Sequence, residues 1–87
     1  MKELPKPQKI NLIYSYPQKK GDPVEQLTMR PPKVRDKLIA QRNSNHTNNA
    51  DIEIELMANL CEVDREVIEE LQEKDYTKLQ EAYTSFL

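Results

Sequence analysis

The chain has 87 residues, of which 32% are charged and 37% apolar, so it forms one small domain at most and is too short for a multidomain enzyme. No apolar run exceeds three residues, which excludes a membrane-spanning helix of about 20 residues. The single glycine excludes a glycine-rich nucleotide-binding loop. Cys61 and His46 are the only cysteine and histidine, too few for a disulfide or a structural zinc site. We therefore expect no metal and no cofactor.

The net charge of −2 is unevenly distributed along the chain. Residues 1–42 contain ten Lys or Arg and four Asp or Glu, a balance of +6, whereas residues 43–87 contain three and eleven, a balance of −8. Such asymmetry indicates either a basic arm for nucleic acid or two halves that attract each other in the fold. We favour the second interpretation, because the acidic half would repel a phosphate backbone brought close to it.

The first 30 residues predict a tail and a hairpin. Residues 1–8, rich in Lys and Pro, are typical of a disordered tail, and they have no apolar stretch that could serve as a secretory signal. Residues 9–30 alternate with the two-residue period of β-strands on either side of a turn around Gly21. The residues expected on the buried face of the hairpin are Ile10, Leu12, Tyr14, Tyr16, Leu27 and Met29.

A helix is predicted over residues 32–42. Pro31 and Pro32 end the preceding strand, and proline is tolerated in the first turn of a helix. The apolar stripe of this helix is expected to consist of Val34, Leu38 and Ile39. The asparagine-rich residues 43–49 predict a mobile polar loop.

The acidic half predicts three further helices, over residues 50–61, 64–72 and 75–86. Their expected N-caps are Asn48 or Asn49, Asp64 and Asp75. With the hairpin and the first helix, they would form a small α+β domain over residues 9–87 whose helices share one core. In that domain we expect the basic and acidic halves to face each other.

Residues suited to catalysis are present but not in a catalytic arrangement. Glutamates occur in pairs, Glu53 with Glu55 and Glu69 with Glu70, but neighbouring glutamates on amphipathic helices normally face solvent. Cys61 follows an apolar residue on a helical stripe, where a free cysteine packs as a small hydrophobe. We therefore expect no enzymatic activity.

Nucleic-acid binding by a small regulator is the main alternative function. Several cations lie on and just before the helix predicted over residues 32–42, as in a recognition helix. They are Arg30, Lys33, Arg35, Lys37 and Arg42. A structural subunit retained in a virion or another assembly is a third alternative.

Two segments, residues 27–36 (LTMRPPKVRD) and residues 56–87, resemble the E-type tail assembly chaperones of Mu-like and related contractile-tailed phages. The matching positions of the first segment are Leu27, Thr28, Met29, Arg30, Pro32 and Asp36. Those of the second are Leu60, Cys61, Val67, Leu71, Asp75, Tyr76, Leu79, Phe86 and Leu87. The resemblance extends over residues 10–87, nearly the whole chain.

The chain departs from the family pattern at three places, one of which is the turn around Gly21, richer in lysine and proline than the family pattern. The family usually has a glycine after the leucine-cysteine step, where a helix ends in a left-handed residue, whereas this chain has Glu62. We therefore expect this helix end to be tighter or differently capped. The loop over residues 43–49 has no clear counterpart in the family.

The resemblance implies a non-enzymatic chaperone, encoded by a phage or prophage and acting in the host bacterial cytoplasm. Such proteins bind the tape measure protein, keep it soluble while tail tube subunits polymerise around it, and leave before the virion is complete. The tail tube protein and a longer, frameshifted form of the chaperone are further implied partners. This chain would be the short form.

The resemblance does not name a binding surface, so we infer one from side-chain chemistry. Methionine and aromatic side chains adapt to varied helical partners. The residues we expect to contact the partner are Met29, Met57, Tyr76, Tyr83 and Phe86.

Overall fold

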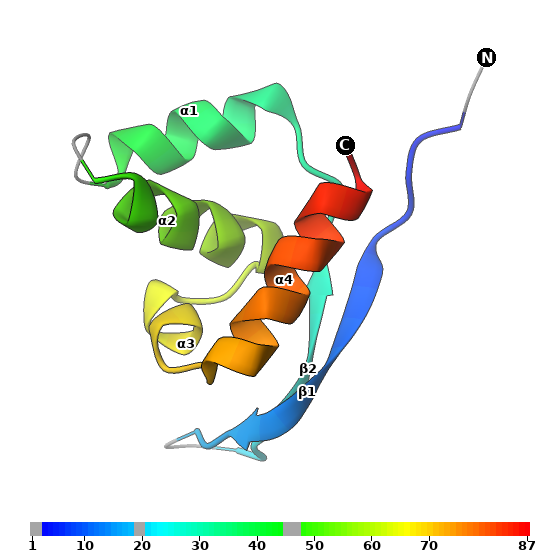
Figure 1. Cartoon of the computed structure of the whole chain (residues 1–87), viewed down its shortest axis with the longest axis vertical. Helices are drawn as coiled ribbons and strands as arrows, with labels where there is room; N and C mark the ends of the chain where they lie inside the picture. Colours follow the sequence, from blue (N-terminus) through cyan, green and yellow to red (C-terminus); the bar gives the residue numbers. More distant parts are fainter. Residues whose placement is uncertain (1–2, 19–20, 45–47) are drawn as a thin grey trace.

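The computed structural model describes residues 3–18, 21–44 and 48–87 (Figure 1). An antiparallel hairpin comes first, formed by β1 (Gln8–Tyr16) and β2 (Val24–Met29). Four helices follow within the described residues: α1 (Val34–Arg42), α2 (Asn49–Cys61), α3 (Arg65–Glu69) and α4 (Glu73–Ser85). The predicted α+β class, with the hairpin ahead of the helices, is confirmed.

The core lies between the hairpin and the helices. Figure 1 shows α4 lying along the hairpin, with α1 and α2 side by side on the other side of α4. Helix α2 contacts α1, α3 and β2, so it holds the central position. The most deeply buried apolar side chains are Met29, Ala40, Met57, Leu60 and Leu79.

The hairpin buries one face, as predicted, but only along part of β1. Ile10 pairs with Leu27 in the register of the two strands, and both side chains are buried. The register becomes irregular between Asn11 and Tyr16. Tyr14, expected in the core, is instead 51% exposed, because this irregularity ends the strict alternation of inward and outward side chains. The prediction for Tyr14 is therefore wrong.

Helix α1 begins at Val34 rather than at Pro32. Lys33 is extended, and its backbone N–H donates to the Asp36 carboxylate at 2.7 Å, while the Asp36 N–H donates to the Lys33 carbonyl at 2.9 Å. This reciprocal pair sets the helix start.

The buried face of α1 also differs from the prediction. Asp36 and Ala40 are buried, whereas Val34 and Leu38 are 80% and 53% exposed. Ile39, the third residue of the predicted apolar stripe, is 37% exposed. Helix α1 packs against α2, and the buried Asp36 carboxylate is bound to Arg30. The predicted apolar stripe therefore faces outward.

Helix α2 begins and ends at well-defined caps. The Asn48 side chain accepts hydrogen bonds from the backbone N–H groups of Ala50 and Asp51, at 3.0 and 3.2 Å, so Asn48 is the N-cap. At the other end Glu62 adopts the left-handed conformation, with φ of 54°. Its neighbour Val63 donates its N–H to the Ala58 carbonyl at 3.1 Å, the 6→1 bond of a Schellman-type helix end.

Helices α3 and α4 meet at a short turn. Asp64 is the N-cap of α3, as predicted, although its side chain makes no capping hydrogen bond, and the helix ends at Glu69 rather than near Gln72. Gln72, not Asp75, is the N-cap of α4. The Gln72 carbonyl accepts the N–H groups of Asp75 and Tyr76, both at 3.0 Å, so the helix starts at Glu73, two residues before the predicted cap.

The segments outside the core agree in part with the sequence predictions. Residues 3–7 form no helix or strand and are exposed, whereas Gln8 is already part of β1. Asn43 and Ser44 follow α1, and the rest of the predicted polar loop up to residue 47, including His46, lies outside the described residues. In the described part of the chain, no helix has the length and apolar character needed to cross a membrane.

Candidate partner-binding surface

Arg30 and Asp36 form a two-pronged ion pair at the junction of the hairpin and α1. The Arg30 Nη1 and Nη2 atoms donate to the two Asp36 carboxylate oxygens at 3.0 and 2.8 Å. The hydrogen bonds from Arg30 hold the pKa of the Asp36 carboxyl below its ordinary value of 3.8. The Arg30 backbone N–H also donates to the Leu60 carbonyl at 3.0 Å. Arg30 therefore joins β2, α1 and α2.

Asp75 connects α4 to β1. It is fully buried, and its carboxylate accepts the backbone N–H groups of Ile13 and Tyr14 at 2.7 and 3.0 Å. Both N–H groups belong to the irregular stretch of β1. The carboxylate therefore supplies partners for backbone donors where the strand pairing is interrupted.

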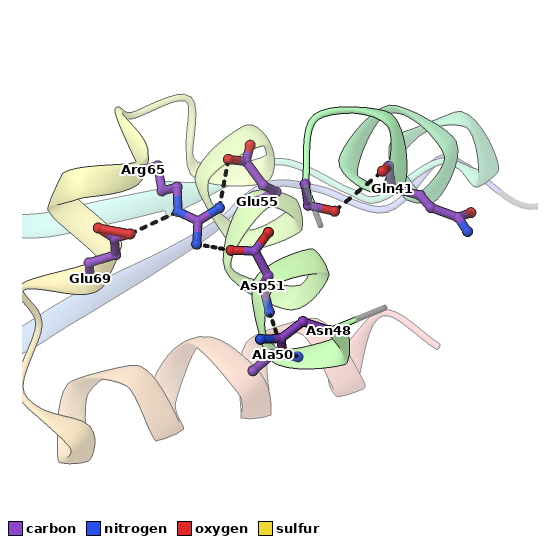
Figure 2. Close-up of polar contacts among 8 residues, drawn as sticks. Gln41, Asn48, Ala50, Asp51, Glu55, Arg65 and Glu69 are labelled. Atoms are coloured by element: carbon purple, nitrogen blue, oxygen red, sulfur yellow. Dashed lines mark hydrogen bonds and ion pairs between the residues drawn. The ribbon is translucent and has the colours of Figure 1, made fainter. Parts of the chain in front are cut away.

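Arg65, the first residue of α3, ties that short helix to α2. Figure 2 shows its guanidinium between Asp51 and Glu55 of α2 and Glu69 of its own helix. The distances from Arg65 to Glu55 and to Glu69 are 3.1 and 2.8 Å. These hydrogen bonds, that with Asp51 foremost, raise the pKa of Arg65 above its ordinary value. The cluster therefore holds α3 against α2 at the surface.

The ion pairs formed between described residues all lie within one half of the chain. Arg30 with Asp36 belongs to the basic half, and the Arg65 cluster belongs to the acidic half. The halves do face each other where they pack, because α1 and β2 contact α2 and β1 contacts α4, but these ion pairs do not cross from one half to the other. The halves are joined instead by apolar packing and by single polar contacts, such as the hydrogen bond of 2.8 Å from Lys78 Nζ to the Asn11 carbonyl.

An open groove lies between α2, α3 and α4, with a volume of about 240 Å³. Its apolar lining comes from Ala50, Ile54, Ile68 and Leu71, with the Tyr76 ring beside them. Glu53, Glu69 and Glu73 add carboxylates. The groove thus combines an apolar lining with three carboxylates.

Tyr76 fixes one wall of this groove. Its hydroxyl donates to Glu53 Oε2 at 2.5 Å, and burial together with this carboxylate raises the pKa of Tyr76 well above its ordinary value. Gln80 Nε2 donates to the same oxygen at 3.3 Å. Glu53 therefore accepts hydrogen bonds from two side chains of α4.

The five expected contact residues fall into two groups. Met29 and Met57 are 0% and 1% exposed, so their side chains lie in the core of the folded chain and offer no surface. Tyr76, Tyr83 and Phe86 lie along α4 and just after it, and each is partly buried against the core. The three aromatic residues thus lie together on α4 and at its end, whereas the two methionines are buried and cannot contact a partner of the folded chain.

A comparison with protein families matched residues 9–87 to the family described as phage tail assembly chaperone proteins, E, or 41 or 14. The chain belongs to this family. Neither the curated proteins nor the solved structures gave a match.

Several residues through which the chain resembles tail assembly chaperones have structural roles. Arg30 and Asp36 form the junction ion pair, Leu60 and Leu79 are core side chains, and Asp75 holds β1. Glu62, at the position where the family usually has glycine, keeps the left-handed conformation of a glycine cap. The expected tighter or different helix end is therefore not found.

The side chains of this tail assembly chaperone that were considered for catalysis are buried or bound to neighbouring side chains. Cys61 is buried, and burial raises the pKa of its thiol to about 11. Glu53 and Glu55 are half-buried and bound to Tyr76 and Arg65, so they do not form the solvated face that was expected. Among the described residues, no group of His, Cys, Asp and Glu is placed to hold a metal ion.

Two features of the surface were missed by sequence reasoning. The Arg65 cluster had a signal, because Asp51 and Glu55, like Arg65 and Glu69, are four residues apart and so share a helix face. The exposure of Val34 and Leu38 had no signal in the sequence. An apolar stripe does not indicate that a carboxylate will occupy the opposite, buried face of the helix.

Proposed function

We propose that this tail assembly chaperone binds the tape measure protein and keeps it soluble while the tail tube assembles. The family match over residues 9–87 carries the proposal. The role is non-enzymatic, takes place in the host bacterial cytoplasm and ends before the virion is complete. The tail tube protein and a longer, frameshifted form of the chaperone are the further proposed partners.

The proposed contact surface is the aromatic side of α4 and the residues that follow it. Tyr76, Tyr83 and Phe86 are partly buried, so each is held in place while part of its ring remains accessible. Leu87, 80% exposed, extends this surface. Partly exposed aromatic side chains on a rigid helix suit the apolar face of an amphipathic partner helix.

The nucleic-acid alternative is weakened by the role of Arg30. Both ends of its guanidinium are bound to Asp36, so it is not free to contact a phosphate. The four other cations, Lys33, Arg35, Lys37 and Arg42, remain exposed.

Co-expression with the tape measure protein of the same phage or prophage tests the proposal. We expect the tape measure protein to become soluble and to co-elute with the chaperone, and Tyr83→Ala and Phe86→Ala to reduce the co-eluting fraction. Val24→Ala is the matched control, since Val24 is also partly buried against the core but lies on β2. A tape measure protein that stays insoluble with both the short and the longer form would contradict the proposal.

A further inference from the structure

The outer side of α1 carries apolar side chains that the rest of the chain leaves uncovered. Val34 and Leu38 lie one turn apart and are 80% and 53% exposed, and Ile39 beside them is 37% exposed. Asp36 and Ala40 mark the inner side of the helix, where both side chains are buried. Because successive residues of a helix are about 100° apart, the opposite, outer side is centred near Leu38.

Cations flank these apolar side chains. At about 100° per residue, Arg35 lies to one side of Leu38 and Lys37 to the other. Arg42 follows Leu38 by one turn, and Lys33 immediately precedes the helix. All four cations are exposed. We call this surface the outer face of α1, and its residues are Lys33, Val34, Arg35, Lys37, Leu38, Ile39 and Arg42.

The positive charge of the outer face is not neutralised by α1 itself. Asp36 is the acidic residue of the helix, and both of its carboxylate oxygens are bound to Arg30 on the inner side. Among the residues that the structure describes, the four cations of the outer face form no ion pair. Lys37 borders a groove between α1 and α2 that Glu53 also lines, so its charge is the least available of the four.

The acidic side of the molecule is separated from this face. Figure 1 shows α1 at one edge of the molecule, with α2 between it and α3. Exposed carboxylates gather on and around α3, at Asp64, Glu66, Glu70 and Glu73. Helix α2 is about 10 Å across, and charges in about 0.1 M salt are screened over about 10 Å. The net charge of −2 therefore does not prevent the outer face of α1 from attracting an anionic surface.

We infer that the outer face of α1 binds an anionic lipid surface. Val34 and Leu38 enter the boundary between headgroups and acyl chains, while Arg35 and Arg42 stay at the level of the lipid phosphates. A helix with an apolar centre and a basic rim is suited to lie in the plane of such an interface. The inference does not depend on the binding of the tape measure protein.

The apolar centre of the outer face favours lipid over nucleic acid. A phosphate backbone would satisfy the cations, but it offers no apolar layer for Val34 and Leu38, which are the outermost side chains of the helix. A lipid interface supplies both the phosphates and the apolar layer. The face is also part of a helix at the edge of the molecule, so a flat surface can approach it (Figure 1).

The binding is expected to be weak, reversible and sensitive to salt. Helix α1 has nine residues and is about 14 Å long, so few apolar side chains can enter the interface. Each cation near an anionic membrane strengthens binding about fivefold, and added salt screens this attraction. Binding should therefore require anionic lipid and disappear at high salt.

Co-sedimentation of the full chain with lipid vesicles tests the inference. Vesicles of phosphatidylcholine alone are compared with vesicles that also contain phosphatidylglycerol, at about 0.02 M and about 0.5 M salt. We expect the chain to pellet with the anionic vesicles at low salt and to stay in solution in the other three conditions. Leu38→Glu and Arg35→Glu should each lower the partition coefficient about tenfold.

The controls separate the outer face from general charge effects. Leu4→Glu and Lys74→Glu make the same substitutions at exposed residues of the tail and of α4, and they should bind as the unmodified chain does. Leu38→Gln removes the apolar side chain without adding a charge, so its loss of binding measures the apolar contribution alone. Circular dichroism verifies that each variant keeps the fold.

Three results would overturn the inference. The first is an unmodified chain that does not pellet with anionic vesicles at low salt. The second is a loss of binding in Lys74→Glu as large as that in Arg35→Glu, which would place the contact elsewhere. The third is a chain that binds duplex DNA but not vesicles, with Leu38→Gln binding DNA normally, which would assign the cations to nucleic acid.

Discussion

The carboxylate of Asp75 accepts a hydrogen bond from the backbone N–H of Ile13 at 2.7 Å, across 62 residues of sequence. Its second oxygen accepts the N–H of Tyr14 at 3.0 Å. In the described part of the chain, no other side chain accepts hydrogen bonds from two consecutive backbone donors of a strand. Because Asp75 is 0% exposed, these bonds are shielded from water, and they fix α4 against the irregular part of β1.

Replacing Asp75 with Asn should destabilise the chain and loosen β1. An amide has one acceptor oxygen, so its NH2 group would face the N–H of Ile13 or Tyr14 and leave one buried donor unpaired. We expect a loss of about 1–3 kcal/mol in the free energy of unfolding, measured by urea denaturation, and faster amide hydrogen exchange at these two residues. The control is Asp64→Asn, because the Asp64 side chain makes no capping bond. Equal stability of the two variants would contradict this role of Asp75.

The Arg30–Asp36 pair should make stability depend on pH in the acid range. The pKa of Asp36 is lowered in the folded chain, so the pair contributes stability above the ordinary pKa of 3.8, and this contribution is lost as the pH falls through the folded pKa. Asp36→Asn should cost about 1.5–3 kcal/mol at neutral pH. Urea denaturation from pH 7 to below about pH 3 should show a smaller acid loss in the variant than in the unmodified chain. Identical pH profiles would show that another carboxylate controls acid unfolding.

Replacing Glu62 with Gly should stabilise the chain. Glu62 has φ of 54°, a conformation that costs a residue with a Cβ atom more than it costs glycine. After allowing for the greater freedom of glycine in the unfolded chain, we expect a gain of about 0.5–1 kcal/mol. Glu62→Ala removes the charge but keeps the Cβ atom, so it separates the two causes in thermal denaturation. A gain of the same size in the alanine variant would assign the effect to charge.

Leu79→Ala should cost more stability than Phe86→Ala. Leu79 is 0% exposed in the core, and such a truncation costs about 2–5 kcal/mol. A fully buried Phe would cost about 3–5 kcal/mol, but Phe86 is only partly buried at the end of α4, so its loss should be smaller. The melting temperatures of the two variants give the order directly. A Phe86→Ala loss as large as that of Leu79→Ala would show that the ring is a core residue and not an accessible contact.

Cys61 should react slowly with thiol reagents while the chain is folded. Burial raises its pKa to about 11, so at pH 8 only about one thiol in a thousand is ionised, and the side chain is 7% exposed. We expect the reaction with a chromogenic disulfide to accelerate strongly in denaturing urea. Fast labelling of the folded chain would show that the α2 end opens frequently in solution.

Much of the architecture followed from local patterns. The alternation around Ile10 and Leu27 predicted the hairpin, and the helical spacing of Leu56 and Leu60 predicted α2. The asparagine before α2 and the aspartate before α3 were placed correctly as caps. The helices and caps depend on backbone hydrogen bonds within a few residues, and the hairpin depends on strands joined by a single turn, so spacing and composition indicate all of them.

The sequence by itself therefore determined the α+β class, the order of the elements and the family to which the chain belongs. Only the tertiary structure decided which faces those elements bury. Asp36 lies on the buried face of α1, so Val34 and Leu38 face solvent. Asp75 binds the backbone of β1 and is not the cap of α4. A buried carboxylate needs donors supplied by distant parts of the chain, so its place depends on packing that no local pattern contains.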